Sequence, residues 1–498
     1  MRLGLDYQLT DKTIMGLIAT GSDNKFSMKD ALANSISTLN GVPTSYEELI
    51  LSEVNHWKHY DINYNIKHNF SNNKFINFDL LYLFYKVKNP IDYANSFFDE
   101  NHIFLYDELS RSRKSTPIKR WVSNIAFSSQ VNKQLNFETG IKGAFSTFED
   151  EVSVEQFINN EWNIDESLTV KSDLVEDIYA AYIDFDYKIS EKWNARFGVR
   201  YEYTNSVLTS DKEGIAVDNQ YGNIFPTLFL NRKFGDDLNM NLSYTKRISR
   251  PTFRQMAPFV IMWNSDTFNL GNIEIQPGIS NSIKYDINYK STIFSLQYTH
   301  EDSPIAQFQS TYDEENDRII FTSENMDYSK IFSVVVGMPL KITDWWRTQN
   351  NLIYTYQDIR AFNSKKETYN LSMGNIMANS TSLFKFSESV SAEISSKYIG
   401  SKYDGTSKRE KYYIIDLGIQ KKFGNNWGSL KFGIDDVFDS TKWVVITDVP
   451  DQNLQVFGDF KLTQRTFKLT YSRSFGNRKL KSSRKRDKDF DEERRRVN

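Results

Sequence analysis

Residues 193–203 read Trp193-Asn-Ala-Arg-Phe-Gly-Val-Arg-Tyr-Glu-Tyr203, and this alternation of apolar and polar residues decides the fold class. The odd positions carry Trp, Ala, Phe, Val and two Tyr, whereas the even positions carry Asn, Arg, Gly, Arg and Glu. Successive side chains of a β-strand point to opposite faces. The stretch therefore predicts a strand with one apolar face and one polar face.

The same alternation recurs along the whole chain. It is clear around residues 179–188, 238–244, 283–289, 430–435 and 466–475. Short turns at 71–74, 190–191, 235–237 and 424–426 alternate with long loops at 21–55, 88–117, 149–176, 250–278, 302–327 and 439–455. Short turns at one end and long loops at the other are typical of outer-membrane β-barrels, in which about 10 residues of each strand cross the membrane. We expect an all-β, transmembrane antiparallel barrel with about 19 strands.

The composition agrees with a lipid-facing barrel. The 498 residues are 25% charged, yet they include 28 Tyr, 36 Phe and 9 Trp. Aromatic girdles around a polar lumen require this combination. The lack of cysteine excludes disulfides and thiolate sites. The net charge of −3 gives no argument for a nucleic-acid partner.

The number of predicted strands is odd, and this bears on which part of a barrel domain the sequence covers. The first predicted strand, 2–9, and the last, 462–475, both descend toward the periplasm, which gives an odd count. Single-chain bacterial barrels normally have an even count. We therefore expect an odd number of strands to be missing from the front of a barrel domain at 1–476. Asp6, Asp11 and Lys12 interrupt the region where a signal peptide needs apolar residues. Residues 477–498 are charged and predict a solvated periplasmic tail.

Two motifs carry a family resemblance. Arg247-Ile-Ser-Arg-Pro251, followed by Gly271-Asn-Ile-Glu-Ile-Gln-Pro277, resembles the pattern of TonB-dependent receptor barrels, most closely the Bacteroidetes outer membrane protein beta-barrel family. Asp435-Asp-Val-Phe-Asp-Ser-Thr-Lys442 resembles the penultimate-strand motif of those receptors, and residues 467–480 resemble their last strand and basic exit.

The resemblance implies a fold and a function. Such receptors have 22 strands and an N-terminal plug, so this chain would hold strands four to twenty-two, without the plug or the first strands. The implied function is uptake of a scarce nutrient, a ferric chelate or an oligosaccharide, across the Gram-negative outer membrane. The implied partners are outer-membrane lipids, the barrel assembly machinery and, in the intact receptor, the plug domain and TonB. No cofactor is implied.

Five residues around the first motif are candidate ligand contacts in an extracellular loop: Arg247, Arg250, Arg254, Trp263 and Asn272. A structural interpretation is favoured for the motif. Pro251 ends ladder pairing, and arginine side chains bond to loop carbonyls. Asn272 suits a turn.

Two histidines and an acidic loop are the candidate metal contacts. His56 and His59 flank Trp57, and a metal or haem contact is conceivable there. Without a nearby cysteine or carboxylate arrangement, ordinary loop histidines are favoured. The acidic residues 313–317 match no calcium loop. We therefore expect no metal site.

The chain lacks a G-x-S-x-G elbow, a phosphate loop and an H-E-x-x-H motif, so an enzyme is not expected.

Three alternatives to a receptor remain open at this stage. A plugless passive pore and a non-functional barrel remnant both fit the strand pattern. A soluble surface-binding β-protein fits less well, because its apolar faces would be exposed to water. Lumen-facing charges such as Asp184, Asp186, Arg196 and Arg200 should pair across strands.

Overall fold

The computed structural model describes residues 1–39, 42–71, 73–212, 214–256, 260–262, 267–314, 318–363, 365–424, 427–452, 454–461, 464–476, 493, 494 and 496. Three sets of sequence predictions fall outside these ranges. They are the candidate Trp263, residues 315–317 of the acidic loop, and most of the tail at 477–498.

A large antiparallel sheet forms most of the molecule. Among the described residues it has 20 strands, one of which, β7 (Glu161–Ile164), is a short strand on the end of β6. The remaining 19 pair in chain order, which confirms the all-β fold and the expected strand number. They are β1 (Arg2–Thr10), β2 (Thr13–Leu39), β3 (Val42–Ser71), β4 (Lys74–Asp99), β5 (Phe104–Gln130), β6 (Leu135–Ile158), β8 (Val170–Lys188), β9 (Trp193–Ser210), β10 (Gly214–Phe234), β11 (Leu238–Ser249), β14 (Gly278–Tyr289), β15 (Thr292–Asp302), β18 (Tyr328–Lys341), β19 (Trp346–Phe362), β20 (Thr368–Lys385), β21 (Val390–Ile399), β24 (Tyr412–Lys422), β25 (Ser429–Asp435) and β28 (Thr466–Ser472).

The two faces of the sheet have opposite character, as the alternation predicts. On β9, Phe197 and Tyr201 point outward and are each 47% exposed, whereas Glu202 points inward and is buried. The convex face thus presents aromatic and aliphatic side chains, and the concave face carries the charges. This is the arrangement of a barrel wall between lipid and a polar interior.

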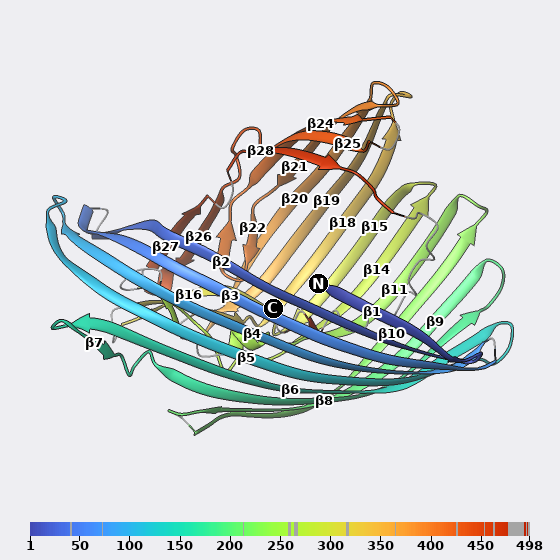
Figure 1. Cartoon of the computed structure of the whole chain (residues 1–498), viewed down its shortest axis with the longest axis horizontal. Helices are drawn as coiled ribbons and strands as arrows, with labels where there is room; N and C mark the ends of the chain where they lie inside the picture. The colour runs from blue at the N-terminus through green and yellow to red at the C-terminus, as the bar shows by residue number, and fades with distance from the viewer. Residues whose placement is uncertain are drawn as a thin grey trace.

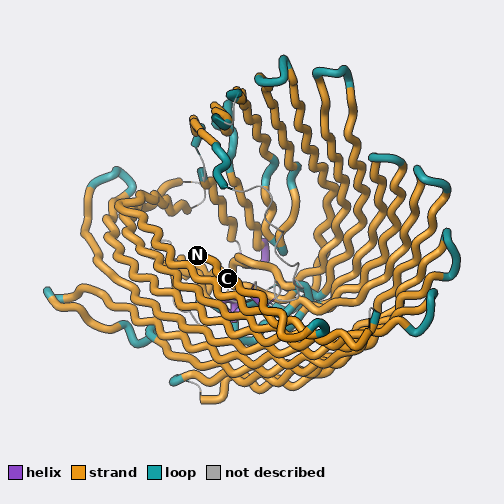
Figure 2. Tube along the Cα trace, turned by 45° about the vertical axis from the view of Figure 1, so that its right-hand side comes forward, coloured by secondary structure: helices purple, strands orange, loops and turns teal. Residues whose placement is uncertain are grey.

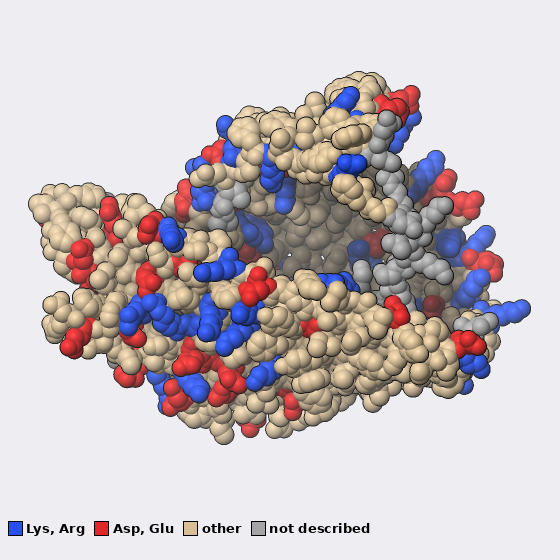
Figure 3. All heavy atoms as spheres, in the orientation of Figure 1, with Lys and Arg blue, Asp and Glu red and all other residues tan. Residues whose placement is uncertain are grey.

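The sheet curls around a hollow without closing on itself (Figures 1 and 2). In the described ranges, β1 pairs with β2 and β28 pairs with β25, and no strand pairing joins β1 to β28. Figure 3 shows the hollow between the two halves of the wall. The sequence predicts a closed or nearly closed barrel, and the structure instead shows an open, strongly curved sheet.

Several strands are much longer than the sequence predicts. β2, β3, β4 and β5 have 27, 30, 26 and 27 residues, so the expected loops at 21–55 and 88–117 are continuous β-hairpins. The reason is physical. Clear alternation marks only the part of a strand that faces lipid. The backbone ladder continues beyond it, where inward residues such as Leu49 and Ile91 pack in a separate buried cluster.

The other long connections contain small sheets and one helical turn. One sheet joins β12 (Val260–Met262), β13 (Thr267–Leu270), β17 (Arg318–Asn325) and β16 (Ile305–Asp313). A second joins β22 (Lys402–Asp404), β23 (Ser407–Arg409), β26 (Trp443–Val449) and β27 (Leu454–Phe460). The helical elements are α1 (Phe253–Met256) and η1 (Pro450–Gln452).

The connection between β11 and β14 folds inward against the concave face. Phe253 of α1 and Phe268 of β13 are buried in an apolar cluster with Leu83, Phe148 and Leu208 of the wall. The rings of Phe148 and Phe253 stack with their centroids 5.7 Å apart. This contact seats the connection, and with it Arg250, inside the curved sheet.

The described end of the chain differs from the expected solvated tail. Glu493 and Arg496 are buried, with 4% and 6% of their surface exposed. Both contact the concave wall. As for membrane helices, none among the described elements is long and apolar enough to cross a bilayer.

Candidate functional site

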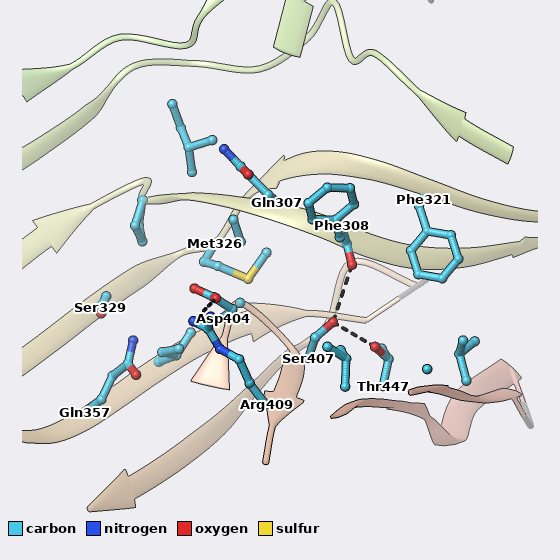
Figure 4. A pocket seen from close by; sticks show the side chains of 18 of the residues that line it. Gln307, Phe308, Phe321, Met326, Ser329, Gln357, Asp404, Ser407, Arg409 and Thr447 are labelled. Atoms are coloured by element: carbon cyan, nitrogen blue, oxygen red, sulfur yellow. Dashed lines mark hydrogen bonds and ion pairs between the residues drawn. The ribbon is translucent and has the colours of Figure 1, made fainter. Parts of the chain in front are cut away.

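Three long connections meet at one end of the sheet and enclose a cavity of about 680 Å³. They run from β15 to β18, from β21 to β24, and from β25 to β28, at the end opposite the short turns. The wall strands β18 and β19 complete the cavity (Figure 4). Its apolar lining includes Phe308, Phe321, Met326, Ile359, Trp443 and Phe460.

Hydrogen bonds tie the three connections together around this cavity. The hydroxyl groups of Ser407 and Thr447 lie 2.7 Å apart, which joins β23 to β26. Ser407 also donates to the carbonyl of Phe308 at 3.3 Å, which joins β23 to β16 (Figure 4). The amide of Thr406 donates to the side chain of Gln309 at 2.7 Å. The cavity is therefore built by residues about 140 positions apart in the chain.

Three polar groups in the cavity are buried without a hydrogen-bond partner among the described residues. They are Nε of Arg409, Nε1 of Trp443 and the hydroxyl of Ser329. The guanidinium of Arg409 lies 5.4 Å from the Trp443 ring centroid and bonds to Asp404 at 2.9 Å. A buried polar group without a partner costs about 1–3 kcal/mol. These three atoms have almost no surface open to the cavity, so a ligand there would contact the aromatic and apolar lining instead.

Arg250, a predicted ligand contact, lies instead against the wall of the sheet. Its Nη2 donates to the carboxylate of Glu202 at 2.6 Å and to the hydroxyl of Thr204 at 3.1 Å. Its side chain is only 6% exposed. These acceptors are a carboxylate and a hydroxyl, in place of the loop carbonyls that the sequence suggests.

The other loop candidates are placed apart from the cavity. Arg247 is exposed on β11, and Arg254 is exposed on α1. Asn272 accepts the amide of Glu274 at 2.9 Å and donates to the carbonyl of Ser323 at 3.0 Å, which is turn chemistry. None of these three residues lines the cavity. Trp263 lies outside the described residues.

The two histidines do not converge on a shared site. His56 contacts Asp23 at 2.6 Å, and His59 contacts Asp61 at 3.6 Å. Three positions separate them on β3, so they project from opposite faces. Among the described residues, no group of three His, Asp or Glu is arranged to hold a metal.

Charged residues of neighbouring strands gather on the concave wall. This luminal charge cluster consists of Arg120 on β5, Lys142 on β6, Glu176 on β8, Glu202 on β9, and Arg250. Nearer the short turns, Arg196 pairs with Asp184 at 2.7 Å, as expected for charges on neighbouring strands. Arg200 pairs with Glu202 of its own strand, not across strands as expected.

Sequence reasoning missed the cavity. Trp443 lies in the predicted loop at 439–455, Arg409 lies outside every predicted long loop, and Ser329 is the second residue of the wall strand β18. No local spacing connects them. The available signal was the apolar run Trp443-Val-Val-Ile446 within a stretch assigned as loop, since such a run needs a partner surface.

Comparisons with known proteins agree with the fold. The outer membrane protein beta-barrel family matches residues 68–473. No curated protein sequence matches the chain significantly. The copper transporter OprC aligns with a TM-score of 0.52 at 11% identity, covering 94% of this chain and 78% of that one.

Two further solved structures share the fold. The siderophore receptor PiuA from Acinetobacter baumannii has a TM-score of 0.52 at 11% identity, with 94% of this chain and 78% of that one covered. The ferric-catecholate import receptor Fiu from K12 E. coli has a TM-score of 0.50 at 10% identity, with the same coverage. At these identities the likeness is one of fold.

Proposed function

This chain belongs to the outer membrane protein beta-barrel family and so to the Gram-negative outer membrane, and from this premise we propose that it is the barrel of a TonB-dependent nutrient-uptake receptor. In the intact receptor a plug domain and TonB would be its partners. The role proposed is transport and not catalysis. The Bacteroidetes origin stays a prediction from the sequence.

The observation that carries this proposal is the cavity between the long connections. In outer-membrane barrels the long loops face the exterior and the short turns face the periplasm. A cavity built from three long connections would therefore face the medium. Its aromatic lining and the guanidinium of Arg409 suit capture of a small solute.

The cavity also narrows the class of ligand. Arg409, which is paired with Asp404, offers a cation beside the aromatic rings of Phe308, Phe321 and Trp443. A ferric catecholate presents aromatic faces and a negative charge, which match both features. An oligosaccharide would use the aromatic faces but not the charge. We therefore propose a ferric chelate, with an oligosaccharide as the second candidate.

Binding of a radioactive ferric catecholate to outer membranes that contain the chain tests this function. We expect Arg409→Ala to weaken binding about tenfold or more, since a hydrogen bond to a charged group contributes about 1.5–3 kcal/mol. Trp443→Ala should weaken it similarly. Trp345→Ala is the matched control, because Trp345 is 49% exposed at a short turn.

The outcomes separate the ligand classes. Binding of maltohexaose with the same sensitivity to Trp443→Ala, but none to Arg409→Ala, would select an oligosaccharide. If neither solute binds, or if Trp345→Ala has the same effect as Trp443→Ala, the cavity is not the uptake site.

A further inference from the structure

The described residues at the end of the chain lie inside the curved sheet, beside the luminal charge cluster. Glu493 and Arg496 are almost completely buried there. Residues 477–492 connect them to the end of the wall. Sixteen extended residues reach about 53–58 Å, more than the roughly 25 Å apolar band of a barrel wall. The chain length therefore permits a return from the short-turn end to the interior.

Glu493 is held by two cations on adjacent strands. Its carboxylate accepts a hydrogen bond from Nε of Arg120 at 2.8 Å and pairs with Nζ of Lys142 at 2.6 Å. Arg120 is 1% exposed and also donates to Ser146 of β6. The contact is thus a buried, charge-assisted pair of the kind that contributes specificity as well as energy.

Arg496 contacts a carboxylate, a backbone carbonyl and an aromatic ring. Its Nη2 donates to the carboxylate of Glu176 at 3.0 Å and to the carbonyl of Pro251 at 3.1 Å. Its guanidinium carbon lies 4.7 Å from the ring centroid of Phe253. The amide of Phe253 in turn donates to the carbonyl of Arg496 at 3.4 Å.

A third contact and the close fit complete the site. Arg494 pairs with Asp61 of β3 at 3.2 Å, and Asp61 is 2% exposed. The space left among the cluster and the two end residues is about 10 Å³, room for about one water molecule. Each charged side chain of the described end thus meets an opposite charge on the wall.

We propose that Asp61, Arg120, Lys142 and Glu176 form a peptide-binding site on the concave wall, and that the chain's own Glu493, Arg494 and Arg496 occupy it. The site takes a short segment in which one carboxylate precedes guanidinium groups. Any other charged segment that enters the lumen must displace this one. The inference goes beyond uptake and does not depend on which solute the cavity binds.

Cross-linking of two introduced cysteines tests the proposal, because the natural chain has none. The Asp61→Cys, Arg494→Cys variant leaves the Glu493 and Arg496 contacts intact. A short bismaleimide should cross-link it in outer membranes. The matched control is Ile62→Cys with Arg494→Cys, since Ile62 is the next residue and lies on the outer face, 49% exposed. We expect at least tenfold less cross-linking in the control.

Removal of the Glu493 and Arg496 side chains provides a second test. Glu493→Ala with Arg496→Ala, added to the Asp61→Cys, Arg494→Cys variant, should reduce the cross-link at least tenfold. These changes lie outside the strands, so the chain should keep its folded electrophoretic mobility without boiling. Equal cross-linking at positions 61 and 62, or cross-linking unaffected by loss of both anchors, would overturn the proposal.

Discussion

At the scale of single residues, the concave face is organised by pairs of opposite charge. The sequence predicts which side chains face inward, because alternation assigns each position to a face. It does not predict their partners. Arg250 illustrates the limit, since its partner Glu202 is 48 positions away on β9. The inward fold of the connection between β11 and β14 brings the two together.

The Arg250–Glu202 pair leads to a stability prediction. Arg250→Ala should lower the free energy of unfolding by about 3 kcal/mol, the lower end of the range for breaking a buried ion pair. The lower end applies because Glu202 keeps Arg200 as a second partner. Urea unfolding in lipid vesicles measures the change. Arg247→Ala, at an exposed position, should change it by less than about 0.5 kcal/mol. Equal effects of the two substitutions would contradict the pairing.

The Glu493 contact should depend on pH. Burial alone would raise the pKa of Glu493, but Arg120 and Lys142 lower it from 4.5 to about 2. A depressed pKa stabilises the bound end above pH 4.5, and that stabilisation is lost as the pH falls toward 2. Glu176 of β8 and Arg496 lie beyond these two cations. We expect the distance between spin labels on the Asp61→Cys, Arg494→Cys variant to stay constant from pH 7 to 5 and to increase between pH 4.5 and 2. A distance that increases between pH 7 and 5 would exclude Glu493 as the titrating group.

At the scale of elements, the sequence predicts where strands lie but not where they end. The lipid-facing part of β9 follows from alternation, whereas the 30-residue length of β3 does not. Beyond that part apolar and polar residues mix on each face, so no clear period of two marks the strand there. The small sheets of the long connections were missed for a related reason. Four of their strands, β12, β13, β22 and β23, have only three or four residues and are too short to show a period.

The two faces of β19 should differ in how much an introduced arginine lowers the free energy of unfolding. Leu352 lies on the outer face in the middle of the strand and is 50% exposed, whereas Thr355 lies on the inner face. Leu352→Arg should destabilise the barrel by about 2–4 kcal/mol, the cost of arginine in the apolar band. Thr355→Arg should cost less than about 1 kcal/mol, because its side chain enters the polar interior. Urea unfolding in lipid vesicles measures the free energy of unfolding of both variants. A greater cost for Thr355→Arg would reverse the assignment of faces.

At the scale of the whole molecule, the chain-order sheet follows from sequence rules, and its closure does not. Neighbouring strands joined by short turns pair with each other, which fixes the order. Closure depends on strand tilt and stagger, which no residue pattern records. In lipid an open sheet edge is unfavourable, because backbone groups lack water. That further strands join β28 to β1, as the odd strand count predicts, stays a prediction.

The central claim is that the convex face of this sheet contacts lipid. Residues 352–356 of β19 test it most directly, through five single-cysteine variants labelled with a fluorophore in vesicles that contain a lipid-borne quencher. We predict strong quenching at positions 352, 354 and 356, and weak quenching at 353 and 355, because strand neighbours face opposite sides. Uniformly weak quenching, or no alternation between odd and even positions, would contradict a barrel wall in the outer membrane.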